Sequence, residues 1–187
     1  GAVQVPNPFL KRHIMRSTYD LFKILKDKKL ISKVGFKDLG AGGIMCATVE
    51  LVSSAGYGAE IDLEKVHISV PDLPPQVIAC SETQERFCWI VPKDLTKMFL
   101  KHYNETWALP SIAKGACASV IGKVKKGNYV LKYKGVKVCD AKPEDITAGL
   151  SYNRPIKPRR KAFHEPKLPM PRDLKAIFLK VLGHENI

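Results

Sequence analysis

Helical and extended segments intermingle along the chain, and this order restricts the possible fold more than any other feature. Apolar residues recur at helical spacing after the capping pair Asn7-Pro8, at Leu10, Ile14, Leu21 and Leu25. Short strands are predicted over residues 33–37 and 59–63, and three more over 118–124, 129–133 and 136–139. A chain of this kind predicts an α/β (α+β) fold, in which helices pack on a mixed β-sheet.

The remaining elements are predicted from glycine and proline residues that begin or end them, and from apolar runs. A helix over 44–53 ends at Gly56 and Gly58, and one helical turn over 76–80 follows a proline-rich loop. The nearly apolar stretch 86–91 predicts a central strand, because a strand covered on both faces has no polar side. Pro92 begins another helix that reaches Tyr103, and a last helix of this part covers 143–150.

The chain changes character beyond Asn153. Prolines recur among basic side chains, at Pro155, Pro158, Pro166, Pro169 and Pro171. A helical pattern then resumes over 172–182, but one helix cannot bury its apolar side alone. We therefore predict one domain over 1–153, a Pro-rich basic linker over 154–171 and the start of a further domain over 172–187. Both ends are expected to be cuts within a longer protein.

Composition narrows the class of protein. The five cysteines are widely spaced without a Cys-x-x-Cys pair, so buried free thiols are expected rather than a zinc or redox site. No apolar run reaches the length of a membrane span and no signal peptide opens the chain, which predicts a cytoplasmic location. The formal charge of +13 is compatible with nucleic acid or another anionic partner, but no RNA-binding motif accompanies it.

Two polar segments could carry chemistry. Asp38 opens a glycine-rich turn that contains Gly40, Gly42 and Gly43 between a predicted strand and helix. Backbone N–H groups there can approach an anion, and a neighbouring carboxylate can hold Mg²⁺. A tight turn with a helix-capping Asp38 explains the same residues without a ligand.

The second segment is 81–86, a run of polar residues directly before the most apolar strand. Gln84 can donate and accept hydrogen bonds, and Glu82 can accept from ribose hydroxyls. A surface ion pair between Glu85 and Arg86 is the simpler alternative. The histidines are scattered, with no partner at metal-ligand spacing, so surface or hydrogen-bonded core positions are expected.

The ordered series of these motifs resembles the synthetase subunits of phosphoribosylformylglycinamidine synthase, within the aminoimidazole ribonucleotide synthetase superfamily. The resemblance rests on Gln4-Val5, Pro8-Phe9, the turn 38–43, the strand 58–63 and the segment 81–86. It covers about residues 1–153, as the superfamily's C-terminal-type domain. Two departures are Thr83, where the family usually has serine, and a longer lysine-rich loop over 27–37.

The resemblance implies an ATP- and Mg²⁺-dependent ligase of purine biosynthesis. It implies that Gln4, Glu82, Thr83 and Gln84 bind formylglycinamide ribonucleotide, that Asp38 binds Mg²⁺ and that the glycine turn meets phosphate. The catalytic histidine of the family is expected outside this chain, so the chain alone is expected to be inactive. Implied partners are the remaining domains of the subunit, a glutaminase subunit and a small bridging subunit.

Two alternatives remain open. Another enzyme of the superfamily would share the glycine-rich loop; the candidates are aminoimidazole ribonucleotide synthetase, selenophosphate synthetase and thiamine-phosphate kinase. A basic nucleic-acid-binding module, suggested by the charge alone, is the weaker alternative because its binding motif is missing.

Overall fold

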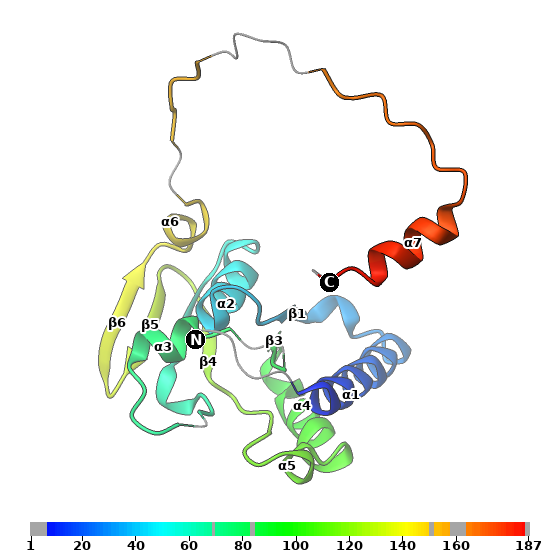
Figure 1. The fold of residues 1–187 in the computed structure, drawn as a ribbon. Coiled ribbons are helices and arrows are strands. Elements are labelled where there is room, and N and C mark those ends of the chain that lie inside the picture. The colour runs from blue at the N-terminus through cyan, green and yellow to red at the C-terminus, as the bar shows by residue number, and fades with distance from the viewer. Residues whose placement is uncertain (1–6, 69, 83–84, 150–151, 158–163, 186–187) are drawn as a thin grey trace. The chain divides into compact units, whose positions relative to one another are not determined.

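The computed structural model describes residues 7–68, 70–82, 85–149, 152–157 and 164–185. The chain divides into two compact units, residues 1–150 and 151–187. The first unit holds two β-sheets with helices packed on them (Figure 1). The second unit contains helix α7 (Leu174–Leu182), which Asp173 caps through its Oδ1. The domain boundaries proposed from the sequence stay a prediction.

Helix α1 (Pro8–Asp27) forms where the sequence predicts it. The Oδ1 of Asn7 accepts a hydrogen bond from the Leu10 N–H at 3.0 Å, and proline occupies the first turn. The apolar side of the helix buries Ile14, Leu21 and Leu25. A short 3₁₀ turn, η1 (Ile31–Lys33), then leads into the first strand.

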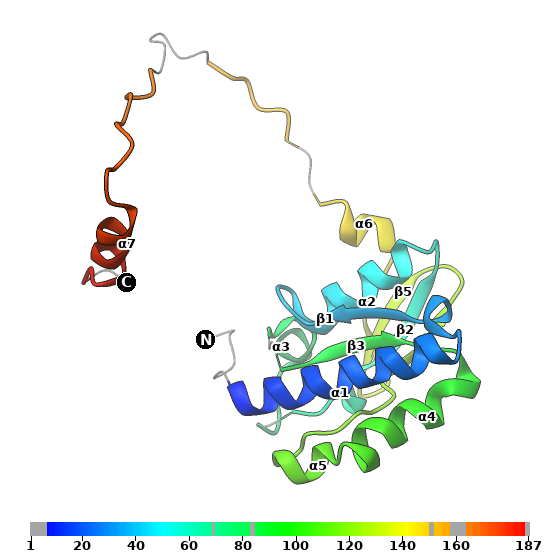
Figure 2. The same ribbon diagram turned by 90° about the vertical axis from the view of Figure 1, so that its right-hand side faces the viewer.

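Strands β1 (Gly35–Asp38) and β3 (Phe87–Ile90) form an antiparallel ribbon, with Asp38 opposite Phe87. Figure 2 shows this ribbon beside α1, with α2 on its other side. Phe36 and Trp89 pack against Phe22 of α1, each with ring centroids 5.2 Å from it.

The prediction of β3 as a central strand is wrong within the part of the chain that the structure describes. There, β3 pairs with β1 alone, in a two-stranded sheet. Its apolar character has another physical cause. The aromatic side of the ribbon meets α1 and α4, whereas Cys88 and Ile90 pack toward the core around α2.

The larger sheet has the strand order β4-β2-β5-β6. It comprises β2 (Gly58–Asp62), β4 (Gly122–Lys125), β5 (Tyr129–Tyr133) and β6 (Val136–Ala141). The β2–β5 pair is parallel and the β2–β4 and β5–β6 pairs are antiparallel, so the predicted mixed sheet with packed helices is confirmed. The first strand of the predicted trio starts later than expected, at Gly122.

Three helices accompany this sheet: α2 (Gly43–Ser53), α3 (Pro75–Cys80) and α6 (Pro143–Thr147). Their shared core with the sheet includes Ile44, Leu63 and Tyr129, and Tyr129 is fully buried. The Tyr129 hydroxyl lies 2.7 Å from the Thr48 Oγ1, which satisfies both buried groups. A 3₁₀ turn, η2 (Leu63–Lys65), follows β2.

The helix expected from Pro92 to Tyr103 consists of several pieces. They are η3 (Lys93–Leu95), α4 (Thr96–Lys101) and the π-helical turn η4 (His102–Thr106), before α5 (Leu109–Ile112). His102 is buried, and its Nε2 lies 2.8 Å from the Ser17 carbonyl oxygen. Across the described residues, none of the helices combines the length and apolar character that a bilayer crossing requires.

The expectation of five buried thiols is wrong. Cys80 is exposed at the end of α3, and the other four cysteines are partly exposed. Cys88 packs from the ribbon against the core around α2, and burial raises the pKa of its thiol to about 11. Neighbouring apolar residues in the sequence do not reveal how much of a small side chain the fold covers.

We expect Cys80 to react with iodoacetamide at pH 8 well before Cys88 does. The Cys88 thiol stays protonated far above the ordinary thiol pKa, and the thiolate is the reacting form. Peptide mass spectrometry after timed labelling measures both rates, and denatured chain provides the control in which the two rates converge. Equal rates in the folded chain would contradict the burial of Cys88.

Candidate functional site

The ribbon brings the two polar segments to one place. Because β1 and β3 are antiparallel and Asp38 faces Phe87, the chain leaving β1 and the chain entering β3 meet at the same end. The Leu39 N–H donates to the Arg86 carbonyl oxygen at 3.2 Å, which extends the pairing by one residue. Segments more than forty positions apart in sequence therefore form one rim.

At Gly43 the glycine-rich turn directly contacts the end of α3 and Ser81. This glycine is the first residue of α2, with φ +55°, and its α-carbon faces the Ser81 carbonyl oxygen. A β-carbon there would collide with that oxygen and lie 3.0 Å from the Ala79 carbonyl oxygen. The contact requires glycine for both its backbone conformation and its lack of a side chain.

The start of α1 lies at the same rim. The Asn7 N–H donates to the Glu85 Oε1 at 3.2 Å, which joins the N-terminal capping residue to the second polar segment. Glu85 therefore contacts the backbone of Asn7, an interaction that the sequence did not suggest. Gln4 lies outside the described residues, three positions before Asn7.

Asp38 is the exposed last residue of β1. A β-carbon at Gly40 would lie 3.7 Å from the Asp38 Oδ2, so the carboxylate extends along the glycine-rich turn. Mg²⁺ is commonly held by one or two carboxylates together with substrate phosphates and water. An exposed carboxylate beside a turn of small residues suits that ligand set. Among the described residues, no group of three or more His, Cys, Asp or Glu side chains could hold a metal ion by itself.

The glycine-rich turn has the backbone of a helix N-terminus. Gly42 precedes α2 with φ +78°, and the Gly43 N–H donates to the Gly40 carbonyl oxygen at 3.0 Å. The Gly43 N–H is therefore already bonded within the turn, although it is one of the backbone donors proposed to bind phosphate. Phosphate binding by Gly40, Gly42 and Gly43 stays a prediction.

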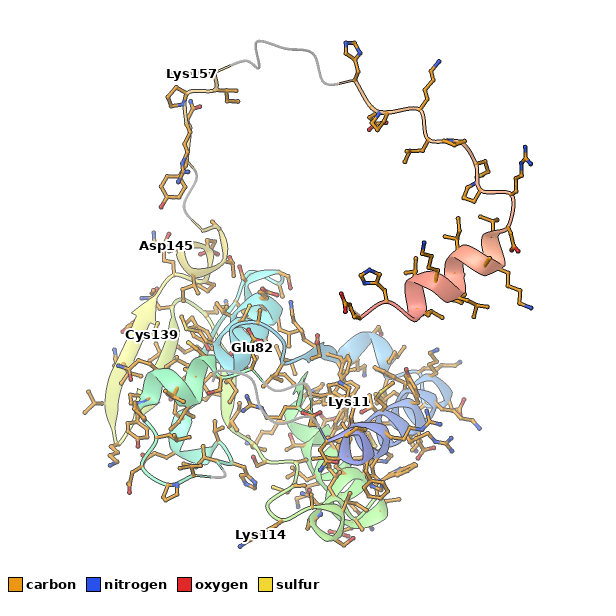
Figure 3. All side chains as sticks on the ribbon, in the orientation of Figure 1. Lys11, Glu82, Lys114, Cys139, Asp145 and Lys157 are labelled. Carbon is orange, nitrogen blue, oxygen red and sulfur yellow. The ribbon has the colours of Figure 1, made fainter. Side chains whose placement is uncertain are left out.

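Glu82 is partly exposed where the end of α3 meets α2 (Figure 3). Thr83 and Gln84 lie outside the described residues. Ser81, the residue before Glu82, is held by α3, since its Oγ donates to the Val77 carbonyl oxygen. The structure thus brings Asp38, the glycine-rich turn and Glu82 together.

Arg86 is the residue whose part sequence reasoning missed. Its Nη2 donates to the Ser81 carbonyl oxygen at 2.8 Å, so the side chain reaches from the end of the polar segment back to its start. Burial lowers the pKa of the guanidinium. Within the described chain Arg86 makes no ion pair, and the surface pair with Glu85 does not form. In the sequence, the place of Arg86 directly before an apolar strand was the only indication of this contact.

Part of the positive charge is neutralised within the fold. The Glu60 carboxylate of β2 forms ion pairs with the Nζ atoms of Lys132 at 3.2 Å and Lys123 at 3.4 Å. Lys37 forms an ion pair with Glu50. The hydrogen bond from Lys132 lowers the pKa of Glu60, with further help from the charges of Lys123 and Lys132. These ion pairs favour solvated faces for at least these lysines over a dedicated nucleic-acid surface.

The sequence was compared with known protein families. The family described as AIR synthase related protein, C-terminal domain, matches residues 1–134. The phosphoribosylformylglycinamidine synthase subunit PurL of Methanothrix thermoacetophila is 42% identical over 188 aligned residues, covering 100% of this chain and 24% of that protein. The chain therefore spans about a quarter of the length of this relative.

Solved structures share the fold. T. maritima PurL complexed with FGAR has a TM-score of 0.66 and 24% identity, covering 88% of this chain and 25% of that one. T. maritima PurL complexed with ATP has a TM-score of 0.64 and 24% identity, covering 88% and 27%.

Proposed function

Because the chain belongs to the AIR synthase related family, as its C-terminal domain, we propose that it supplies half of the active site of a phosphoribosylformylglycinamidine synthase. The reaction is the ATP-dependent conversion of formylglycinamide ribonucleotide and ammonia to the formylglycinamidine. ATP phosphorylates the amide oxygen of the substrate, and ammonia then displaces phosphate from the iminophosphate.

One observation carries this proposal. Three of the five motifs that carry the resemblance meet at one rim: the start of α1, the turn 38–43 and the segment 81–86. The Leu39–Arg86 and Asn7–Glu85 hydrogen bonds and the contact of Gly43 with Ser81 join them. A structural explanation of each motif alone does not require them to meet. A divided substrate site does, because each segment must reach the same ligand.

The residues take separate parts in the proposal. Glu82, Thr83 and Gln84 bind the ribonucleotide, with Gln4 reaching it from the start of the chain. The carboxylate of Asp38 holds Mg²⁺, which neutralises phosphate charge when it is bound. The glycine-rich turn lets the backbone approach a phosphate group without a side chain between them.

The proposal extends to the surroundings of this chain. The catalytic histidine, the remaining domains, a glutaminase subunit and a small bridging subunit complete the system, which operates in the cytoplasm. The 187-residue chain alone is then inactive. Release of ADP from this chain with all substrates present would contradict the division of the active site.

Asp38→Asn in the full-length protein is expected to raise the Mg²⁺ concentration needed for half-maximal turnover about tenfold or more, because an amide lacks the charge that attracts the cation. The exposed Asp72→Asn provides a matched control outside the glycine-rich turn and the segment 81–86, and should leave the Mg²⁺ requirement unchanged. Titration of turnover with Mg²⁺ at saturating ATP measures both. An unchanged curve for Asp38→Asn would remove Asp38 from the metal site.

The reaction itself is tested by omission. With Mg-ATP present, ADP release by the full-length protein should require both formylglycinamide ribonucleotide and ammonium. Release that instead requires aminoimidazole precursors, selenide or thiamine phosphate would assign the chain to another enzyme of the superfamily. Release that needs no second substrate would contradict a synthetase.

A further inference from the structure

Arg86 occupies a position that is costly for its side chain. Its Nε is buried, and within the described residues this nitrogen has no hydrogen-bond partner. A guanidinium keeps its charge under all ordinary conditions, and a buried unsatisfied donor destabilises a protein. Among the described residues, no carboxylate forms an ion pair with Arg86. The cost of burying the guanidinium is therefore offset only in part, by the hydrogen bond to Ser81. Such a group calls for an explanation.

Among the described residues, the Arg86 side chain makes one hydrogen bond, and its acceptor is specific. Nη2 donates to the Ser81 carbonyl oxygen, which is the atom that also faces Gly43. At its backbone, the Arg86 carbonyl oxygen accepts from the Leu39 N–H. One residue therefore ties both ends of the polar segment to each other and to the glycine-rich turn.

We propose that Arg86 is the positioning residue of the substrate loop 81–86, holding its two ends at the separation that lets the residues between them bind the ribonucleotide. This inference rests on the function proposed above, and it assigns Arg86 no contact with the reacting atoms. The guanidinium holds the Ser81 carbonyl oxygen, next to Glu82, and the binding roles proposed for Glu82, Thr83 and Gln84 depend on that end of the segment. The buried Nε is the cost of placing a rigid, planar donor beside Ser81.

A positioning role and a purely structural role predict different results for stability. Arg86→Met removes the unsatisfied Nε together with the bond to Ser81, because a methyl group takes the place of that nitrogen, so the two effects on folding offset each other. The loop, however, loses the constraint on its ends. Misplacement of a substrate-binding group by about 1 Å can cost on the order of 100-fold in activity.

The test uses the full-length protein and three variants, with thermal unfolding and steady-state kinetics on each. For Arg86→Met we expect the KM for formylglycinamide ribonucleotide to rise about 10- to 100-fold, while the KM for ATP changes less than about twofold and the melting temperature is maintained. Arg86→Lys, whose ammonium can still donate to Ser81, should restore part of the substrate affinity. Arg12→Gln removes an exposed arginine of α1 and should match the wild type in all measurements.

The outcomes separate the two levels of the proposal. A wild-type protein without ribonucleotide-dependent ADP release would contradict the proposed function itself. A functional wild type with an unchanged ribonucleotide KM in Arg86→Met would overturn the role of Arg86. A lower melting temperature together with equal losses for both substrates, in Arg86→Met and in Arg86→Lys alike, would show a structural role and would also overturn it.

Discussion

Gly43→Ala is expected to destabilise the folded chain by about 2–5 kcal/mol and to separate the glycine-rich turn from the loop 81–86. The new β-carbon meets the Ser81 carbonyl oxygen and lies 3.0 Å from that of Ala79. Both neighbours are backbone atoms, so no side chain can rotate away. A non-glycine residue at φ +55° adds about 1–2 kcal/mol, and the steric overlap about 1–3 kcal/mol more.

Gly56→Ala is the matched control for this substitution. Gly56 has φ +72°, but a β-carbon there would have no neighbour within 4 Å. It should therefore show only the conformational cost of about 1–2 kcal/mol. Urea unfolding of both variants gives the two free energies, and the difference between them reports the contact with Ser81. Equal losses in the two variants would contradict the close approach of the turn and the loop.

Leu21→Ala is expected to cost about 2–5 kcal/mol of unfolding free energy. Leu21 is 0% exposed, within the core that α1 forms with Trp89, Phe99 and Tyr103. The substitution opens a cavity beneath the aromatic side of the ribbon, whose end carries the candidate site. The same variant should therefore weaken the support of β3 as well as the helix.

Phe9→Ala provides the comparison on the same helix. Phe9 is 68% exposed, so its loss should change the unfolding free energy by no more than about 0.5 kcal/mol. Urea unfolding monitored by tryptophan fluorescence follows Trp89 and Trp107 in both variants. A cost for Leu21→Ala no larger than that for Phe9→Ala would show that α1 does not pack as described.

The local elements were predictable because their signals are local. The Asn7-Pro8 start and the apolar spacing of α1 specify a helix without reference to the rest of the chain. The turns at Gly127 and Gly135 have positive φ and delimit β5, as turn chemistry predicts. The mixed sheet followed from the order of such elements.

Pairing and depth of burial could not be predicted in the same way. The apolar sequence of β3 is compatible with a wide sheet or with a ribbon covered on both faces, and only the tertiary arrangement decides between them. Cys80 and Cys88 each directly follow an apolar residue, yet one is exposed and the other has a raised thiol pKa. Exposure depends on segments that are distant in sequence.

The candidate site divides along the same line. Asp38, Gly43 and Glu82 were proposed from motifs and a family resemblance, and the structure brings them to one rim. Arg86 had no comparable signal, because its contact with Ser81 depends on the path of the loop. Gln4, Thr83 and Gln84 lie outside the described residues, and their roles rest on the proposal.

The most direct test of the account is ribonucleotide-dependent ADP release by the full-length protein and by its Gln84→Ala variant, with Gln76→Ala as the control. Gln76 is an exposed glutamine of α3, outside the proposed substrate loop. We predict release that requires formylglycinamide ribonucleotide and ammonium, a loss of about tenfold or more in kcat/KM for Gln84→Ala, and wild-type behaviour for Gln76→Ala. Full activity in Gln84→Ala, or release by the wild type without the ribonucleotide, would contradict the claim that this chain supplies the substrate loop of such a synthase.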